Sequence, residues 1–229
     1  MAQVYWLGQR LADVPPGSAW LSEAEREAEA RLRVPKRRLD WRLGRWTAKL
    51  ALLRLRALGG DGLGELAALE IRAAPSGVPR AFRDGVRVPW TVSISHSRGR
   101  AIVAVRPDAS AVGCDIEAVE PRGQAFLEDS FTLAERDAIA ASPAPELWAT
   151  LYWSAKESAM KVLGEGLRLP LASFAVASLG ERTTGTGWRS LELLERRSAR
   201  RFAGYWRSDH DCVLAILGAA PFAEPVPLG

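Results

Sequence analysis

The sequence has little cysteine and no long hydrophobic run. Its two cysteines, Cys114 and Cys212, are too few for a disulfide framework, which predicts a reducing, cytoplasmic setting. No apolar stretch approaches the roughly 20 residues that a membrane-spanning helix needs, so we expect no membrane segment. The first residues lack a basic region followed by an apolar run, so we expect no signal peptide.

Acidic residues are scarce in one part of the chain. Residues 31–58 contain one acid, Asp40, against ten basic residues: Arg31, Arg33, Lys36, Arg37, Arg38, Arg42, Arg45, Lys49, Arg54 and Arg56. Such a run attracts phosphate-bearing ligands, nucleic acid or an acidic protein. The alternative for most of these residues is a solvated helix face in an arginine-rich protein.

The pattern of apolar residues and turn signals predicts a mixed α/β protein. Helices are predicted at 22–33, 38–58, 132–141 and 145–163, and strands at 3–7, 68–73, 90–95, 100–105, 111–117, 172–178, 188–195, 200–206 and 212–217. Ser22 with Glu25 three residues later forms a capping-box pattern at the first helix. Four residues at 59–62, three of them glycine, end the second helix.

Each half of the chain runs in the same order, from a strand through helices to several strands. This order predicts two similar α/β lobes, an N-terminal lobe at 1–108 and a C-terminal lobe at 109–229. The turn at 106–110 is the best separator between them.

Two acidic segments point to chemistry. In the strand 112–117, Asp115 and Glu117 share one face because side chains alternate. In the helix 145–163, Glu157 and Lys161 lie one turn apart, next to the apolar Trp153. Three carboxylates are ligands that Mg²⁺ prefers, and a lysine suits a phosphate. The alternatives are a polar strand edge and a surface salt bridge.

A third segment supports a phosphate site. Val92 and Ile94 alternate with two serines in a strand that ends at His96 before a glycine turn. Hydroxyl and imidazole groups at a strand end can donate hydrogen bonds to phosphate oxygens. A lone histidine at a turn is more often structural, so this segment gains meaning only beside the two acidic ones.

Together these segments resemble the surfactin-type 4′-phosphopantetheinyl transferases. The residues 93–97 (Ser-Ile-Ser-His-Ser), 113–117 (Gly-Cys-Asp-Ile-Glu) and 153–161 (Trp-Ser-Ala-Lys-Glu-Ser-Ala-Met-Lys) occur in the order and spacing of that family. The resemblance extends to 131–135, to 164–170 and back to Gly44-Arg45. It covers most of residues 36–175.

The resemblance implies a fold and an activity. Such enzymes are α/β (α+β) proteins with two similar lobes in a pseudo-twofold arrangement, and coenzyme A lies in the cleft between them. They transfer its 4′-phosphopantetheine group to a serine of an apo acyl- or peptidyl-carrier protein, as in secondary metabolite biosynthesis. The reaction requires Mg²⁺ and releases 3′,5′-ADP. The length of 229 residues favours this single-chain, monomeric type over the trimeric fatty-acid type.

The resemblance also implies roles for residues of the acidic segments. Asp115, Glu117 and Glu157 match the magnesium-binding carboxylates, and Glu157 also matches the general base, acting directly or through water. Lys161 matches the lysine that contacts the transferring phosphate.

Five further residues match contacts to coenzyme A. Ser95 and His96 match phosphate contacts, and Arg45 matches a basic residue near the 3′-phosphate, where Lys36 and Arg37 assist.

The chain departs from the family at 77–79, where a basic residue is common and this sequence has Val78. Arg80 is a candidate replacement. A competing hypothesis is a nucleic-acid-binding protein that uses the basic helix at 36–49 with its two tryptophans. That hypothesis leaves the three carboxylates unexplained, so we expect no nucleic-acid partner and no membrane partner.

Overall fold

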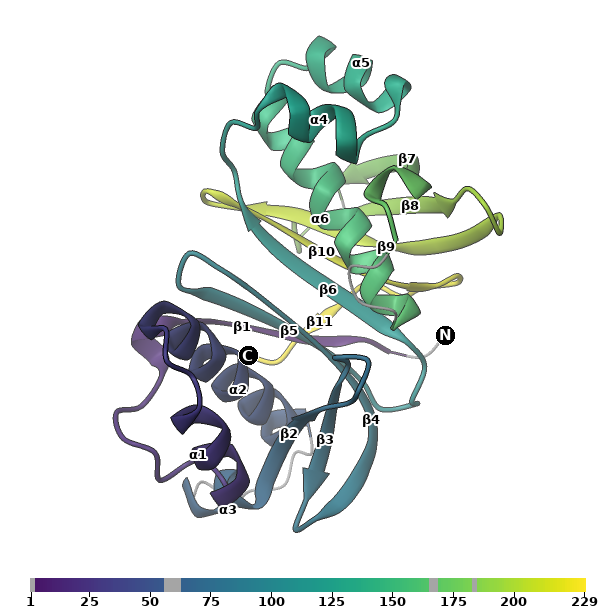
Figure 1. Cartoon of the computed structure of the whole chain (residues 1–229). Helices are drawn as coiled ribbons and strands as arrows, with labels where there is room; N and C mark the ends of the chain where they lie inside the picture. The colour runs from purple at the N-terminus through teal and green to yellow at the C-terminus, as the bar shows by residue number, and fades with distance from the viewer. Residues whose placement is uncertain (1–2, 56–62, 165–168, 183–184) are drawn as a thin grey trace.

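Two β-sheets, each covered by helices, form the protein (Figure 1). The computed structural model describes residues 3–55, 63–164, 169–182 and 185–229. The first sheet has the order β11-β1-β5-β4-β3-β2, and the second has the order β6-β10-β9-β8-β7. The predicted α/β class with two similar lobes is therefore confirmed.

The first lobe contains the elements up to residue 106. They are β1 (Tyr5–Arg10), α1 (Glu23–Ala30), α2 (Pro35–Leu55), α3 (Leu63–Ala68), β2 (Leu69–Ala73), β3 (Pro79–Arg83), β4 (Val86–Ser97) and β5 (Arg100–Arg106), with a 3-10 turn at Leu11–Asp13.

The second lobe contains most of the elements that follow. They are β6 (Val112–Ala118), α4 (Gln124–Ser130), α5 (Leu133–Ala141), α6 (Pro145–Leu163), β7 (Phe174–Arg182), β8 (Arg189–Glu195), β9 (Arg200–Asp209) and β10 (Cys212–Ala219), with a 3-10 turn at Leu171–Ser173. The last strand, β11 (Val226–Pro227), returns to the first sheet and pairs with β1. The division at residue 108 stays a prediction. None of the helices in the described ranges is long and apolar enough to cross a membrane.

The sequence analysis missed four short elements: α3, β3, α4 and β11. The strand β3 opens on Pro79, and Gly123 precedes α4, so both looked like turns. The predicted helix end at 56–58, the glycine-rich break at 59–62 and the motif residues 165–168 lie outside the described residues.

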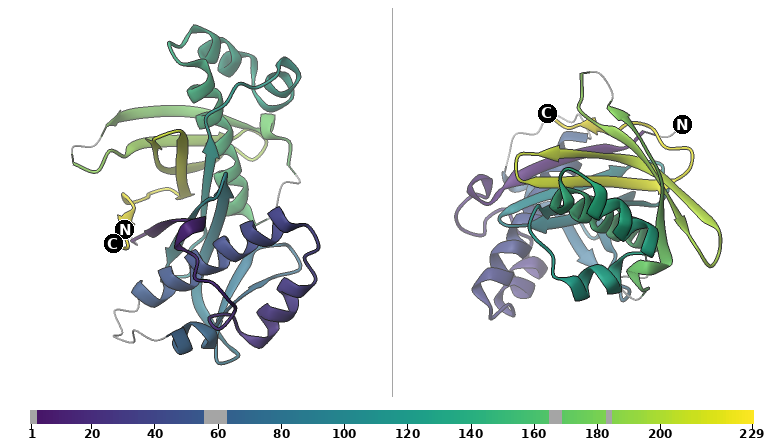
Figure 2. Two further views of the ribbon diagram at one scale, coloured as in Figure 1. Left: turned by 90° about the vertical axis from the view of Figure 1, so that its left-hand side faces the viewer. Right: turned by 90° about the horizontal axis from the view of Figure 1, so that it is seen from above.

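The two sheets repeat one topology. Apart from β11, the order β1-β5-β4-β3-β2 corresponds strand by strand to β6-β10-β9-β8-β7, and α1 and α2 correspond to α5 and α6. Figure 2 shows the two lobes from two further directions. The chain is thus an internal repeat, although its halves show little sequence identity.

A buried ion pair marks the repeat in the first lobe. Lys49 on α2 is fully buried, pairs with Glu25 of α1 and donates a hydrogen bond to the Trp20 carbonyl oxygen at 2.9 Å. Glu25 forms the predicted capping box with Ser22 and also accepts from the Ile71 N–H of β2 at 2.9 Å. One carboxylate therefore ties two helices to the sheet.

The second lobe repeats this arrangement. Lys156 on α6 is fully buried, pairs with Glu135 of α5 at 2.7 Å and donates to the Ser130 carbonyl oxygen at 2.9 Å. Glu135 forms a capping box with Thr132 and accepts from the Val176 N–H of β7 at 3.0 Å. Each lobe thus fixes its long helix through the same kind of buried pair.

Close packing of α6 on β6 brings the two acidic segments together. A Cβ atom at Gly113 of β6 would lie 1.9 Å from the Ser158 carbonyl oxygen of α6, so only glycine permits this approach. The strand β6 also packs across the lobe boundary, where the Cys114 N–H donates to Ser93 Oγ of β4 at 2.9 Å. The strand β6 therefore lies between α6 and the first lobe.

Candidate active site between the two lobes

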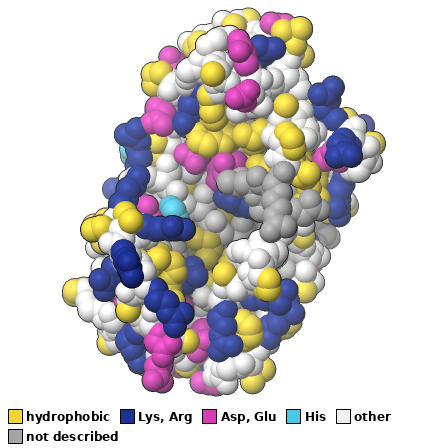
Figure 3. Space-filling model, viewed as in Figure 1, with side chains coloured by type: hydrophobic (Ala, Val, Ile, Leu, Met, Phe, Trp, Pro, Cys, Tyr) yellow, Lys and Arg dark blue, Asp and Glu magenta, His cyan; other side chains and the backbone are white. Residues whose placement is uncertain are grey.

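Three carboxylates meet where β6 faces α6. Asp115 and Glu117 on β6 and Glu157 on α6 each offer an oxygen atom, and these atoms lie within 4.8 Å of one another. Figure 3 shows acidic side chains gathered near the middle of this face of the molecule. The structure thus brings together the three residues that were predicted from the sequence to be metal ligands.

Asp115 has one oxygen atom held and one oxygen atom free. Its side chain is fully buried, and Oδ1 accepts hydrogen bonds from Ser95 Oγ and Lys161 Nζ, both at 2.7 Å. Its Oδ2 is buried with no hydrogen-bond partner among the residues that the structure describes. An unpaired buried carboxylate oxygen is costly. A cation bound at Oδ2 would remove that cost, so the site fits a metal ion.

Glu117 and Glu157 are half-buried and each has one donor. Ser97 Oγ donates to Glu117 at 3.1 Å, and Trp153 Nε1 donates to Glu157 at 2.8 Å. Burial, followed by the nearby charge of Asp115, raises the pKa of both carboxyl groups to about 7. Three carboxylates this close repel one another as anions, which again favours a bound cation.

Lys161 supplies a positive charge beside the carboxylates. Its Nζ donates to Asp115 and to the Cys114 carbonyl oxygen at 3.0 Å. Burial by itself lowers the pKa of the Lys161 ammonium, but the charge of Asp115 outweighs it and the pKa is raised. Lys161 therefore stays charged and can bind an anionic oxygen.

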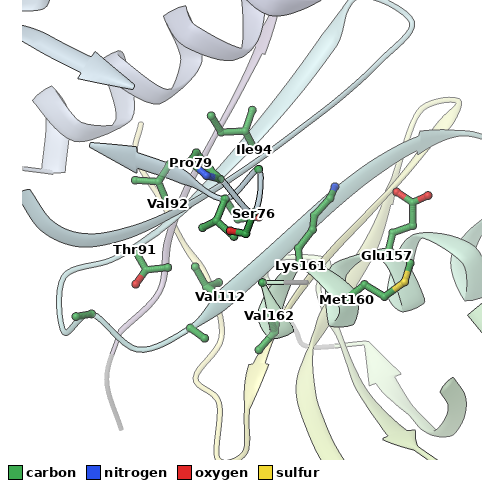
Figure 4. A pocket seen from close by; sticks show the side chains of 16 residues that line it. Ser76, Pro79, Thr91, Val92, Ile94, Val112, Glu157, Met160, Lys161 and Val162 are labelled. Atoms are coloured by element: carbon green, nitrogen blue, oxygen red, sulfur yellow. The ribbon is translucent and has the colours of Figure 1, made fainter. Parts of the chain in front are cut away.

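An apolar cavity of about 380 Å³ adjoins Glu157 and Lys161. Its walls come from both lobes, with Val92 and Ile94 of β4 on one side and Met160 of α6 on the other. Figure 4 shows the Glu157 and Lys161 side chains side by side on α6, extending in the same direction. The cavity can therefore hold an uncharged group beside these two charged residues.

A second cavity, of about 620 Å³, lies next to the first and is basic. It shares Gly77, Pro79 and Ile94 with the apolar cavity. Asp40 and Trp41 line it, together with four of the residues expected near coenzyme A phosphates: Lys36, Arg37, Arg45 and His96. Segments about 50 residues apart in the sequence thus meet in one groove.

Arg45 has unused hydrogen-bonding capacity in this groove. Its guanidinium lies 4.8 Å from the Trp41 ring centroid, and its Nε is buried with no partner in the described part of the chain. A stacked guanidinium with free N–H groups is well suited to a phosphate.

Other residues named from the sequence have different surroundings. The Ser95 hydroxyl is engaged with Asp115, and its expected phosphate contact stays a prediction. Val78 lines the apolar cavity, whereas Arg80 is not among the described residues that line either cavity.

Much of the basic run is already neutralised. Arg38 and Arg42 both pair with Glu29 at 2.8 Å, and Lys49 pairs with Glu25. The helix α2 is therefore not a bare cationic face, and three of its cations, Lys36, Arg37 and Arg45, line the basic groove. This favours a compact phosphate ligand over nucleic acid.

Sequence reasoning missed two donors, Ser97 and Trp153. The sequence analysis named Trp153 only as an apolar neighbour of Glu157 and Lys161, yet its indole N–H donates a hydrogen bond to Glu157. Two spacings contained the signal: Trp153 lies four residues before Glu157 in a helix, and Ser97 follows Ser95 on the same face of β4.

The internal repeat does not produce a second acidic site. In the repeat, β1 corresponds to β6, and its partner β5 corresponds to β10. By the register of these two strand pairs, Leu7 and Gln9 of β1 are the counterparts of Asp115 and Glu117 of β6. Leu50 is the counterpart of Glu157, because it follows the buried Lys49 as Glu157 follows the buried Lys156. Because these three counterparts carry no carboxylate, the repeat predicts no second metal site at the equivalent position of the first lobe.

Comparisons with known proteins agree with this geometry. Residues 111–216 match the sequence model of the 4′-phosphopantetheinyl transferase superfamily. A 4′-phosphopantetheinyl transferase of Bacillus subtilis is 34% identical over 56% of this chain and 55% of its own length. The 4′-phosphopantetheinyl transferase Sfp of Bacillus subtilis (strain 168) is 32% identical over 59% of this chain and 58% of its own length.

The matched chain spans little more than half the length of these curated relatives. Among solved structures, the holo-[acyl-carrier-protein] synthase of Thermotoga maritima covers 57% of this chain and 75% of its own, with 22% identity and a TM-score of 0.37. The sequence matches confirm the family resemblance that the motifs indicated, and none of them supports the nucleic-acid hypothesis.

Proposed function

We propose that this relative of the surfactin-type 4′-phosphopantetheinyl transferases moves the phosphopantetheine group of coenzyme A onto a serine of an apo carrier protein. The observation that carries the proposal is the free Oδ2 of Asp115, which lies among three carboxylates beside Lys161. This cluster lies close to the apolar cavity and its basic neighbour. The parts of coenzyme A follow one another in the order of these regions: an apolar arm, a pyrophosphate and a phosphorylated nucleoside.

Each part of coenzyme A has a complementary region. The 3′-phosphate is placed in the basic groove, where Arg45 has a free N–H and Lys36 and Arg37 add charge. The pyrophosphate is placed near His96 and Lys161, between the groove and the carboxylates. The apolar cavity, which is lined by residues of both lobes, takes the pantetheine arm.

The carboxylates suit a hard divalent cation. Asp115, Glu117 and Glu157 would hold Mg²⁺, and bound Mg²⁺ would supply Lewis-acid neutralisation of the pyrophosphate charge. Ser95, Ser97 and Trp153 hold these carboxylates in place through one hydrogen bond each. Such outer-shell partners usually orient metal ligands.

The transfer itself exchanges one P–O bond for another. The acceptor serine oxygen forms a bond to the β-phosphorus of coenzyme A, and the bond from that phosphorus to the bridging oxygen of 3′,5′-ADP breaks. Glu157 accepts the serine proton directly or through water. Lys161 binds the transferring phosphate and stabilises the charge that develops as ADP leaves.

The proposal requires neither a second copy of the chain nor an oxidising compartment. Both walls of the site come from one chain, so we propose a monomer. Both cysteines are buried free thiols, which is consistent with a cytoplasmic setting.

Mass spectrometry tests the reaction class. An apo carrier domain incubated with the protein, coenzyme A and Mg²⁺ should gain the mass of one phosphopantetheine, and 3′,5′-ADP should appear in equal amount. Omitting coenzyme A or adding excess EDTA should prevent the gain. No gain on a panel of acyl- and peptidyl-carrier domains would contradict the proposal.

Arg45→Ala should weaken coenzyme A binding without slowing chemistry. A lost charged hydrogen bond should raise KM for coenzyme A by roughly tenfold or more and leave kcat near normal. The variant should barely distinguish coenzyme A from dephospho-coenzyme A, which lacks the 3′-phosphate. Arg54→Ala, on the same helix but outside the groove, is the matched control. Retained preference for coenzyme A would assign the phosphate to Lys36 or Arg37 instead.

Magnesium affinity should fall as the pH falls from 8 to 6. In the metal-free protein Glu117 and Glu157 have pKa values of about 7, so both are mostly protonated at pH 6 and must release protons to bind a cation. Calorimetry should show binding weaker by roughly tenfold or more at pH 6.

The same raised pKa values affect the stability of the metal-free protein. A carboxyl pKa above its unfolded value favours the folded state at low pH, and that contribution is lost as the pH rises through 7. In EDTA the Tm should therefore decrease between pH 6 and pH 8, and Mg²⁺ should raise the Tm more at pH 8. A metal affinity independent of pH would contradict both expectations.

A further inference from the structure

Arg122, in the loop between β6 and α4, is an arginine that the reaction scheme above does not use. Its guanidinium lies 4.1 Å from the ring centroid of Trp153 and 5.4 Å from that of Phe126. The side chain is only 13% exposed. A charged group withdrawn this far from water needs a compensating interaction or a role.

Arg122 is incompletely satisfied. Its Nη1 pairs with Glu120 at 3.1 Å, whereas Nε and Nη2 are buried with no hydrogen-bond partner among the described residues. Of the two aromatic rings beside it, the guanidinium lies nearer to Trp153 than to Phe126. Such a stack is attractive because the positive charge lies over the electron-rich face of the indole ring.

The stacked tryptophan is the donor to Glu157. Along α6, Trp153, Glu157 and Lys161 follow one another at intervals of four residues, so they lie on one face of the helix. The Trp153 indole N–H donates to Glu157 Oε1 at 2.8 Å. Phe126 of α4 contacts the same indole edge to face, with a centroid distance of 5.0 Å. Rotation of the indole would break its bond to Glu157.

Arg122 is in turn anchored to both lobes. Glu120, which binds Arg122, also pairs with Arg98 at the tip of the β4–β5 hairpin of the first lobe. The chain of contacts Arg98–Glu120–Arg122–Trp153–Glu157 thus runs from the first lobe to the metal-binding face of α6.

We propose that Arg122 is a positioning residue of the transfer reaction, which holds the Trp153 indole against Glu157 and so fixes that carboxylate for metal binding and proton acceptance. This inference rests on the proposed function. Removal of a group that orients a metal ligand typically lowers metal affinity or activity by about 10- to 100-fold.

The first test observes the indole without any metal or substrate. In a ¹H–¹⁵N spectrum, the Trp153 indole signal is assigned by its loss in Trp153→Phe. Arg122→Met, which keeps the aliphatic stem but removes the planar charge, should shift that signal. Arg189→Met is the matched control, because Arg189 stacks on Trp206 at 5.1 Å on a different element, β8. An unshifted Trp153 signal in Arg122→Met would overturn the inference.

The second test separates positioning from simple charge. Removing a positive charge near Glu117 would tighten the binding of a cation, whereas a disordered Glu157 would weaken it. We therefore expect Mn²⁺, followed by electron paramagnetic resonance, to bind about 10-fold or more weakly to Arg122→Met. Tighter or unchanged binding would overturn the positioning role. Arg122→Lys keeps the charge but loses the planar stack, so it should restore little of the affinity.

The third test is kinetic. Arg122→Met should lower kcat by about 10-fold or more and leave KM for coenzyme A within about twofold, because the residues placed against coenzyme A are elsewhere. A change confined to KM would overturn the inference. Failure of the proposed function is distinguishable, because the wild-type protein would then neither bind Mn²⁺ nor modify a carrier domain.

Discussion

Asp115→Asn and Glu157→Gln should each lower phosphopantetheine transfer by about 100-fold or more while leaving the protein folded. Both changes remove one negative charge and keep the shape of the side chain. Asp115 is the carboxylate with the free buried oxygen, and Glu157 is both a candidate ligand and the candidate base. Initial rates are measured at saturating coenzyme A, with Mg²⁺ raised about 10- to 100-fold above the concentration that saturates the wild type. Weak binding of coenzyme A or Mg²⁺ is then not mistaken for lost chemistry.

Glu128→Gln is the control for these two variants. Glu128 is an exposed carboxylate on α4 of the same lobe, and it pairs only locally with Gln124. Its removal changes the net charge by the same amount, so activity should stay near that of the wild type. Wild-type turnover in Asp115→Asn or Glu157→Gln, with circular dichroism unchanged, would remove these residues from the site.

Lys156→Met should destabilise the protein more than any other single change considered for α6. The ammonium of Lys156 is fully buried and binds Glu135 and the Ser130 carbonyl oxygen. Removing one partner of a buried pair leaves an uncompensated charge and costs about 3–5 kcal/mol. For a chain of this size the Tm should fall by roughly 6–20 °C, which differential scanning calorimetry measures.

A double variant identifies the cause. In Glu135→Gln/Lys156→Met the stranded charge is gone, and the amide oxygen can still accept one of the two N–H bonds that Glu135 receives through its separate oxygens, from Thr132 and from Val176. The double variant should regain more than half of the lost stability. Lys49→Met should show a similar loss, because Lys49 makes the equivalent pair with Glu25. A loss in Lys156→Met that the double variant does not repair would assign the effect to packing instead.

Two lysines of α6, Lys156 and Lys161, have different roles. Lys156 points into the core of the second lobe, whereas Lys161 is 27% exposed at the site. Lys156 directly precedes Glu157, and Lys161 follows it by four residues. From the sequence alone, either lysine could be taken for the catalytic cation. The helical period separates them, because five residues turn the side chain to another face.

The sequence by itself determined the local features of this protein. Alternation along β6 placed Asp115 and Glu117 on one face, and the four-residue interval on α6 placed Glu157 beside Lys161. The ordered motifs indicated the resemblance to the 4′-phosphopantetheinyl transferases, and the repeated order of elements predicted two similar lobes. Such features depend on residues a few positions apart, so backbone geometry specifies them directly.

Only the tertiary structure decided which of these faces meet. The bond from Lys161 to Asp115 spans 46 residues, and the bond from Ser95 to Asp115 crosses from one lobe to the other. The free Oδ2 of Asp115 and the stack of Arg122 on Trp153 are likewise invisible in the sequence. Periodicity fixes the direction of a side chain relative to its own element, but the partner that it reaches depends on how the two sheets and their helices pack.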